Sequence, residues 1–132
     1  MDARRTATEE GLSSVGQQLA LFRMAEIGEG QSLGLDPRGC GTDELFALRH
    51  QGSVHLYRNS CPHQDIPMQY RKDRFLSADG KRVICYAHGA HFEPNTGLCT
   101  HGPCLGERLR AVPWIDVDGW VVIDGFLLDG HY

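Results

Sequence analysis

The 132-residue sequence has no apolar run near the roughly 20 residues that a bilayer-spanning helix requires. It also has no basic excess, because its formal net charge is -4, and this argues against binding to nucleic-acid phosphates. The Arg4-Arg5 pair is followed by polar and acidic residues instead of the apolar segment that an export signal needs. We therefore expect a cytoplasmic protein that interacts with neither nucleic acid nor membrane.

The cysteine count is odd, which does not suit a framework built only of disulfides. In a chain without an export signal, such a count fits metal or redox use better. One of the five cysteines, Cys40, has no evident partner in its glycine-rich segment. The five are Cys40, Cys61, Cys85, Cys99 and Cys104.

Turn-forming residues are abundant, with 16 glycines and six prolines, as is typical of an all-β fold. We expect residues 1–20 to form a flexible N-terminal tail and residues 21–132 to form one domain. A first strand is predicted at 22–27, followed by a glycine-rich connection at 28–44. Hairpins are predicted for 44–49 with 53–58, for 73–77 with 81–85, and around Asp118-Gly119. The predicted fold is a small antiparallel sandwich or barrel with irregular loops at 60–70, 86–97 and 99–107.

Two of these loops each contain one cysteine and one histidine. Cys61 and His63 form a C-x-H pair, and Cys85 and His88 form a C-x-x-H pair after a gap of 21 residues. Neighbouring loops of this kind can present two sulfurs and two nitrogens to a metal. Zinc fingers usually pair Cys with Cys and His with His, whereas these loops mix the two types. A [2Fe–2S] cluster with both thiolates on one iron and both imidazoles on the other suits the mixed pairs better.

The pattern C-x-H, then C-x-x-H followed by Gly89, resembles the signature of Rieske-type [2Fe–2S] proteins. The resemblance runs from Phe22 to Ile123, and Gly102-Pro103 matches the family's third, proline-bearing loop. It implies an all-β Rieske-type antiparallel sandwich or barrel in which loops form a small cluster-binding subdomain.

The resemblance also implies one [2Fe–2S] cluster per chain and assigns its ligands. Cys61 and Cys85 would bind one iron, and His63 and His88 would bind the other. Cys99-Thr100-His101 also reads C-x-H, but its use would reverse the family's order of motifs. We expect Cys99 and Cys104 to be buried residues of the third loop, with a disulfide between them possible. His91 lies three residues beyond a proposed ligand and could tune the site, although packing or exposure is the simpler role. The remaining histidines are expected on strands or at the surface: His50, His55, His91, His101 and His131.

The ligand set determines the charge of the cluster. Two thiolates cancel the 2+ charge of an oxidised core, so reduction adds one negative charge, and histidine ligation raises the potential into a range of about −150 to +300 mV. High-potential relatives carry a disulfide where this chain has Ile66 and Ala87, and hydroxyl groups where it has Ala90 and Phe92. We therefore expect a potential near the low end, on the order of −150 mV.

These features favour a Rieske-type ferredoxin, an electron carrier and not an enzyme, that transfers one electron between a flavin or nicotinamide reductase and a terminal oxygenase. A monomer is expected. In this family the histidine-ligated iron lies nearest the surface, and its surroundings would be either a small docking patch or ordinary loop packing. The residues expected to frame it are Ile66, Pro67, Met68, Pro103 and Leu105.

Three other classes of protein share some of these features. An oxygenase is not expected, because the residues beyond the Rieske-like segment are too few for a domain with a two-histidine, one-carboxylate iron. A small non-catalytic subunit of a larger reductase, similar to that of assimilatory nitrite reductases, stays an alternative, although such relatives often lack cluster ligands. A zinc-stabilised binding module is the other alternative, which metal analysis would distinguish.

Overall fold

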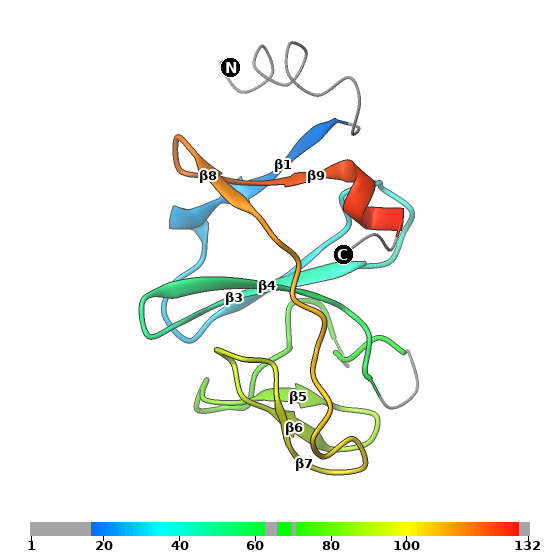
Figure 1. Ribbon diagram of the computed structural model, residues 1–132. Helices are drawn as coiled ribbons and strands as arrows, with labels where there is room; N and C mark the ends of the chain where they lie inside the picture. Colours follow the sequence, from blue (N-terminus) through cyan, green and yellow to red (C-terminus); the bar gives the residue numbers. More distant parts are fainter. Residues whose placement is uncertain (1–16, 63–65, 70, 130–132) are drawn as a thin grey trace. The chain divides into compact units, whose positions relative to one another are not determined.

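Short antiparallel strands dominate the structure, a computed structural model that describes residues 17–62, 66–69 and 71–129 (Figure 1). Contacts divide the chain into two compact units. One unit combines the segment up to Glu26 with the segment from Val112 onward, and the other is Ile27–Ala111. Most of the expected tail lies outside the described residues, and its last three positions, from Gln18 onward, belong to a strand. No helix among the described residues is long and apolar enough to cross a membrane.

The first unit contains a three-stranded sheet in the order β1-β9-β8, with all neighbours antiparallel. These strands are β1 (Gln18–Arg23), β8 (Ile115–Val117) and β9 (Trp120–Asp124). The predicted turn at Asp118-Gly119 joins β8 to β9, and both turn residues have positive φ. The strand predicted at 22–27 was placed too late, because β1 ends at Arg23, opposite Trp120, where its partner strand begins. A short 3-10 helix, η1 (Met24–Glu26), follows, and η2 (Gly125–Asp129) follows β9.

The second unit begins with a sheet in the order β2-β3-β4. Its strands are β2 (Ser32–Leu35), β3 (Leu45–His50) and β4 (Ser53–Arg58), which run antiparallel to their neighbours. The predicted hairpin of β3 and β4 is confirmed, and Gln51 and Gly52 form its tip with φ of 53° and 82°. The predicted glycine-rich connection at 28–44 contains one strand that the sequence analysis did not predict, β2. Pairing with β3 makes this segment a strand although its Ser-Leu-Gly-Leu sequence has little intrinsic β-propensity.

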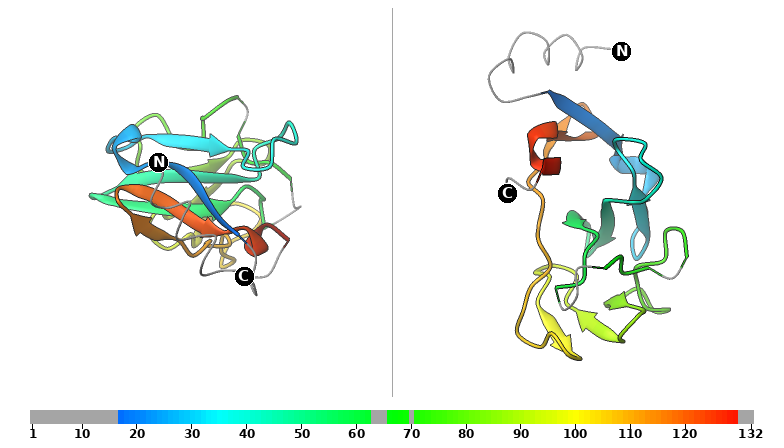
Figure 2. Two further views of the ribbon diagram at one scale, coloured as in Figure 1. Left: turned by 90° about the horizontal axis from the view of Figure 1, so that it is seen from above. Right: turned by 90° about the vertical axis from the view of Figure 1, so that its right-hand side faces the viewer.

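A second sheet in the same unit has the order β5-β6-β7. It consists of β5 (Val83–Cys85), β6 (Ala90–Phe92) and β7 (Cys99–His101), shown in yellow-green to yellow (Figure 2). The predicted turn before β5 is present, because the Gly80 N–H donates to Ser77 O at 2.8 Å. The predicted partner strand at 73–77 is reduced to one bridge, Leu76 to Val83. Its first residue, Asp73, has a φ of 64°, and this left-handed conformation interrupts the extended chain.

Side chains from both sheets form the core of this unit, which includes four of the five cysteines. The Phe46 ring of β3 stacks on Phe75 with centroids 4.3 Å apart, and Tyr57 lies 5.7 Å from Phe46. The buried thiols therefore belong to the hydrophobic core, where solvent is excluded. The core comprises Phe46, Leu48, Tyr57, Cys61, Met68, Phe75, Val83, Cys85, Ala90, Phe92, Cys99, Cys104 and Leu109.

Candidate metal centre

Cys61 and Cys85 come from different parts of the sequence and meet in the core. Cys61 lies just after β4, Cys85 is the last residue of β5, and both are completely buried. Burial raises the pKa of the Cys85 thiol, and a hydrogen bond with Cys61 raises it further. The two sulfurs predicted on separate loops are therefore neighbours, as a shared iron would require.

The two predicted histidines differ in what the structure shows of them. His88 lies in the exposed turn after β5, whereas His63 lies outside the described residues. The turn is closed by the Gly89 N–H, which donates to Cys85 O at 2.7 Å, and Gly89 has a φ of 70°. Backbone N–H groups of His88 and Ala87 also donate to the Cys85 sulfur and partly oppose the rise of its pKa. The turn thus combines an exposed imidazole with donors that stabilise negative charge on a buried sulfur.

Backbone hydrogen bonds connect the two loops directly. The Tyr86 N–H of the second loop donates to Met68 O of the first at 2.9 Å. Within the first loop, the Cys61 N–H donates to Ile66 O, also at 2.9 Å. The Tyr86 hydroxyl adds a bond of 2.8 Å to Leu76 O. These bonds determine the spacing of the two loops without any metal.

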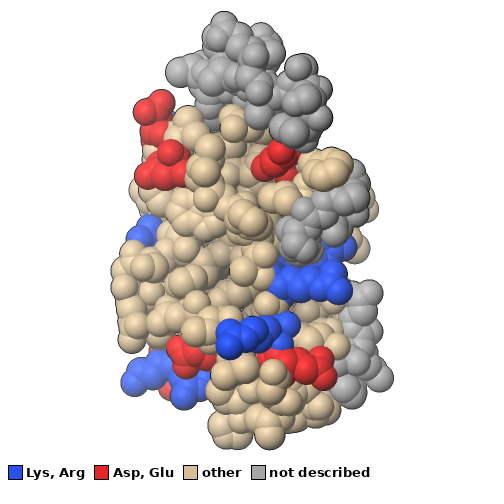
Figure 3. All heavy atoms as spheres, viewed as in Figure 1, with Lys and Arg blue, Asp and Glu red and all other residues tan. Residues whose placement is uncertain are grey.

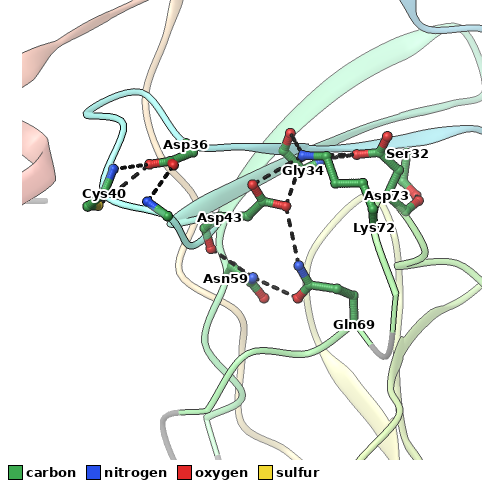
Figure 4. A network of polar contacts seen from close by, with 10 residues as sticks. Ser32, Gly34, Asp36, Cys40, Asp43, Asn59, Gln69, Lys72 and Asp73 are labelled. Carbon is green, nitrogen blue, oxygen red and sulfur yellow. Dashed lines mark hydrogen bonds and ion pairs between the residues drawn. The ribbon is translucent and has the colours of Figure 1, made fainter.

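Asn59 anchors both ends of the first loop, a role that the sequence analysis missed. Its side-chain oxygen accepts the Met68 N–H at 2.9 Å, and its amide donates to Asp43 O and to Gln69 Oε1 at 2.9 and 2.8 Å (Figure 4). The Asn59 N–H donates to Glu44 O at 2.9 Å. An asparagine directly after a strand and before a C-x-H loop was the only available signal. Asn59 therefore ties the segment that carries Cys61 to its neighbouring loop.

Asp43 extends this anchor to β2 (Figure 4). Its carboxylate accepts from Lys72 Nζ at 3.1 Å and from Gln69 Nε2 at 3.4 Å, and Lys72 Nζ also donates to Gly34 O at 3.1 Å. A side chain at Gly34 would collide with this carboxylate. The absence of a Cβ at Gly34 is therefore what lets the polar network reach the backbone of β2.

The third loop packs against the second at a glycine. Gly102 has a φ of 102°, and a Cβ at this position would lie 2.8 Å from Ala90 Cα. Only glycine satisfies both the left-handed backbone and this close approach. The Gly102-Pro103 segment of the sequence pattern therefore lies directly beside the turn that carries His88.

Cys99 and Cys104 are buried in this third loop, as predicted. Their exposed fractions are 2% and 0%. Cys104 Sγ lies 3.2 Å from Cys99 Sγ, and the two sulfurs are not joined in a disulfide. Burial raises the pKa of Cys104, and hydrogen bonds with Cys99 and with Cys61 raise it further. Cys104 is therefore a neutral thiol at neutral pH that contacts one of the predicted ligands.

The other predicted residues divide between core and surface. Met68 is completely buried, so its inclusion in an exposed docking patch was wrong, because its side chain fills the core beneath the loops. Pro67, Pro103 and Leu105 are exposed, and Leu105 is 68% exposed. The sequence indicated no partner for Cys40, and in the structure its Sγ donates to Asp36 Oδ1 at 3.5 Å.

Two largely exposed stretches, 86–89 with His88 and 102–106 in the third loop, contain no charged residue. On the face drawn in Figure 3, the part of the second unit that carries β6 and β7 ends in a group of uncharged residues, with Lys, Arg, Asp and Glu above and beside it. The rings of His91 and His101 lie nearby with centroids 5.3 Å apart. This surface could contact a partner without first having to desolvate charges.

Two buried sulfurs, an exposed imidazole and three adjoining loops on a small β-scaffold define a metal-binding electron-transfer type of site. Comparison with known families identifies it further: the family model described as Rieske [2Fe–2S] domain matches residues 6–117. The chain belongs to this family, and its cofactor is a [2Fe–2S] cluster. The buried, adjacent thiols of Cys61 and Cys85 fit that cofactor, which needs a thiolate pair on one iron.

Similar proteins include ferredoxins of oxygenase systems. The ferredoxin component of the alkene monooxygenase system of Xanthobacter autotrophicus (strain ATCC BAA-1158 / Py2) is 32% identical over 73 residues. That match covers 54% of this chain and 57% of the relative, so it spans little more than half of the relative's length.

Solved structures share the fold. A ferredoxin of Sphingomonas yanoikuyae B1 is 25% identical, with a TM-score of 0.62 over 82% of this chain and 98% of that one. The ferredoxin of carbazole 1,9a-dioxygenase from Nocardioides aromaticivorans IC177 is 20% identical, with a TM-score of 0.61 over 81% and 96% of the two chains. The predicted all-β Rieske-type fold is confirmed.

Proposed function

We propose that this protein is a Rieske-type ferredoxin that passes single electrons from a reductase to a terminal oxygenase. In this proposal Cys61 and Cys85 bind one iron of the cluster, and His63 and His88 bind the other. The observation that carries it is the pairing of two fully buried thiols from separate loops beside an exposed histidine turn. When bound, the cluster supplies a site that accepts and releases one electron.

The protein's own residues give the site a buried side and an exposed side. The sulfur ligands lie in the core, where Phe92 and Val83 exclude water, and the His88 turn lies at the surface. An electron therefore has its shortest route to a partner through the imidazoles. The exposed and uncharged residues Leu105 and Pro103 would form the contact, which suits a small and short-lived interface.

The named relatives support the direction of transfer. One is the ferredoxin component of an alkene monooxygenase system, and one similar structure is a complex of reduced oxygenase with oxidised ferredoxin in carbazole 1,9a-dioxygenase. An electron carrier that is not itself the oxygenase agrees with both. We also propose that the protein acts in the cytoplasm, because five cysteines, an odd number, fit metal or redox use better than a disulfide framework. A monomer suits a carrier that contacts its partners one after the other.

The proposed potential is low, on the order of −150 mV. Ala90 and Phe92 are completely buried at positions where high-potential relatives have hydroxyl groups, so neither can donate to the cluster. Among the residues that the structure describes, the backbone N–H groups of Ala87 and His88 and the Cys104 thiol act as donors at the two sulfurs. Fewer donors leave the extra negative charge of the reduced form less stabilised, which lowers the potential.

Spectroscopy of the reduced protein tests the ligand assignment. We expect two iron and two sulfide per chain, and an electron paramagnetic resonance signal with a low average g value after dithionite. His88→Ala and His63→Ala should abolish that signal, whereas the matched control His101→Ala should retain it. A colourless protein with one zinc, or loss of the signal in His101→Ala alone, would contradict the assignment.

A reconstituted electron-transfer chain tests the role. The purified protein should be reduced by a nicotinamide-dependent flavin reductase and reoxidised by a Rieske oxygenase in rapid-mixing experiments. Leu105→Glu should slow transfer to the oxygenase and leave the cluster's spectrum unchanged, because it adds a charge to the contact surface only. Failure of every such oxygenase to accept electrons would favour the alternative of a subunit in a larger reductase.

A further inference from the structure

We propose that Cys99 and Cys104 form a reversible disulfide, and that its formation withdraws a hydrogen-bond donor from Cys61. The first part of the proposal, disulfide formation, does not depend on which residues bind iron. The second part, the loss of a donor to Cys61, rests on the ligand assignment of the proposed function. The first part concerns two cysteines that bind no iron in that assignment. Nothing in the family's ligand pattern gives these two residues a role.

The geometry of the two thiols is close to that of a disulfide. Their sulfurs are 3.2 Å apart, and a bond requires about 2.05 Å, so the approach needed is about 1.2 Å. Backbone bonds bring both residues together: the Cys99 N–H donates to Glu107 O at 2.8 Å, and the Glu107 N–H donates to Cys104 O at 2.8 Å. Side-chain rotation could therefore close the bond without unfolding the loop.

The pair lies beneath a thin layer of exposed chain. Cys104 is buried, but its neighbours on both sides, Pro103 and Leu105, are exposed. A groove lined by Cys61, Pro62 and Gly106 opens next to the loop. A small oxidant such as hydrogen peroxide could reach the sulfurs by this route or when the short loop opens.

The reaction balances with peroxide as the oxidant. Both S–H bonds break and one S–S bond forms, so the two cysteines lose two electrons and two protons. Hydrogen peroxide takes up these electrons and protons and yields two molecules of water. A dithiol or another cellular thiol returns the pair to the reduced form by exchange.

Oxidation would change the surroundings of Cys61. The Cys104 thiol donates to Cys99 Sγ at 3.2 Å, and Cys61 belongs to the same buried cluster and helps to raise the pKa of Cys104 through a side-chain hydrogen bond. A thiolate at Cys61 that binds iron is the stronger acceptor for this S–H group, and such a donor stabilises the more negative, reduced cluster. A disulfide leaves Cys104 without its hydrogen, so the reduced form loses this support and the potential falls.

The first experiment counts thiols in the protein with its cluster bound. After mild peroxide and then alkylation under denaturing conditions, three of the five cysteines should react, and all five should react after added dithiothreitol. Cleavage after Phe92 and Arg108 yields a fragment in which Cys99 and Cys104 are the only cysteines. That fragment should be lighter by the mass of two hydrogens. The matched control Cys40→Ser should form the same disulfide.

Full alkylation of this fragment while other cysteines become oxidised would overturn the first part of the proposal. A disulfide that includes Cys61 or Cys85 would overturn it as well. This outcome does not depend on which residues bind iron, so it is separate from failure of the proposed function.

The second experiment measures the potential. Peroxide should lower the midpoint of the wild-type protein, changing its redox equilibrium by up to about tenfold, which equals about 59 mV for one electron. Cys104→Ala should show the lowered value without peroxide, and Cys104→Ser should restore the reduced wild-type value because its hydroxyl can donate. Cys99→Ala should keep the reduced value and not respond to peroxide. Equal midpoints in Cys104→Ala and Cys104→Ser would overturn the second part.

Discussion

Replacing Asn59 by alanine tests how the ligand-bearing loop is anchored. The side chain is 8% exposed and makes three hydrogen bonds, with Met68 N–H, Asp43 O and Gln69 Oε1. Leaving the buried Met68 N–H without an acceptor costs about 1–3 kcal/mol, and each of the other two hydrogen bonds contributes about 0.5–1.5 kcal/mol. Because Gln69 can rotate to another partner, we expect a total loss of about 2–4 kcal/mol in the free energy of unfolding.

Denaturant unfolding followed by circular dichroism measures this loss, and bleaching of visible absorbance measures release of the cluster. Release should be at least about tenfold faster, since about 1.4 kcal/mol already changes the population of an opened loop tenfold. Asn95→Ala is the matched control, because the Asn95 amide donates to Gln51 Oε1 at 2.9 Å at the exposed surface. It should cost less than about 0.5 kcal/mol. Equal losses in the two variants would refute the anchoring role of Asn59.

Three further predictions concern the core and the third loop. Tyr57→Phe should lower the free energy of unfolding by about 1–2 kcal/mol, because its buried hydroxyl donates to Pro94 O, whereas the exposed Tyr86→Phe should cost less in the same denaturant titration. Burial raises the pKa of Tyr57 to about 12 from 10.0, so the unfolded chain loses this proton first and stability should fall by about 2–3 kcal/mol between pH 10 and 12. Alkaline unfolding curves should show that fall in the wild type and a smaller one in Tyr57→Phe; equal falls would contradict the assignment. Gly102→Ala should destabilise more than Gly106→Ala, since both have positive φ but only a Cβ at 102 meets a neighbour, and thermal melts that rank them in the opposite order would contradict this packing.

The hairpins were predictable because their turn residues and the alternation of their strands are local properties. Gln51-Gly52 and Asp118-Gly119 both adopt the positive φ that such turns require. Strand β2 was not predictable, because it exists through pairing with β3 and through the polar network around Gly34. The end of β1 was likewise determined by where its partner β9 begins.

The candidate site was predictable in its ligand types but not in its supports. Cysteine and histidine spacing is visible in a sequence, and it led to Cys61 and Cys85, which the fold brings together in the core. The anchoring by Asn59 depends on hydrogen bonds to residues 9 to 16 positions away in the sequence, and no local pattern reveals such bonds. Met68 was misplaced because an apolar residue directly after a proline looks the same in sequence whether its side chain points outward or into the core.

Pulsed electron paramagnetic resonance of the reduced protein with ¹⁵N-labelled histidine tests the mixed ligation most directly. The account predicts nitrogen couplings from two imidazoles at one iron. The same two couplings should remain when His101 is replaced. A reduced cluster without any imidazole coupling would mean that sulfur alone holds the irons, and it would contradict the assignment of His63 and His88.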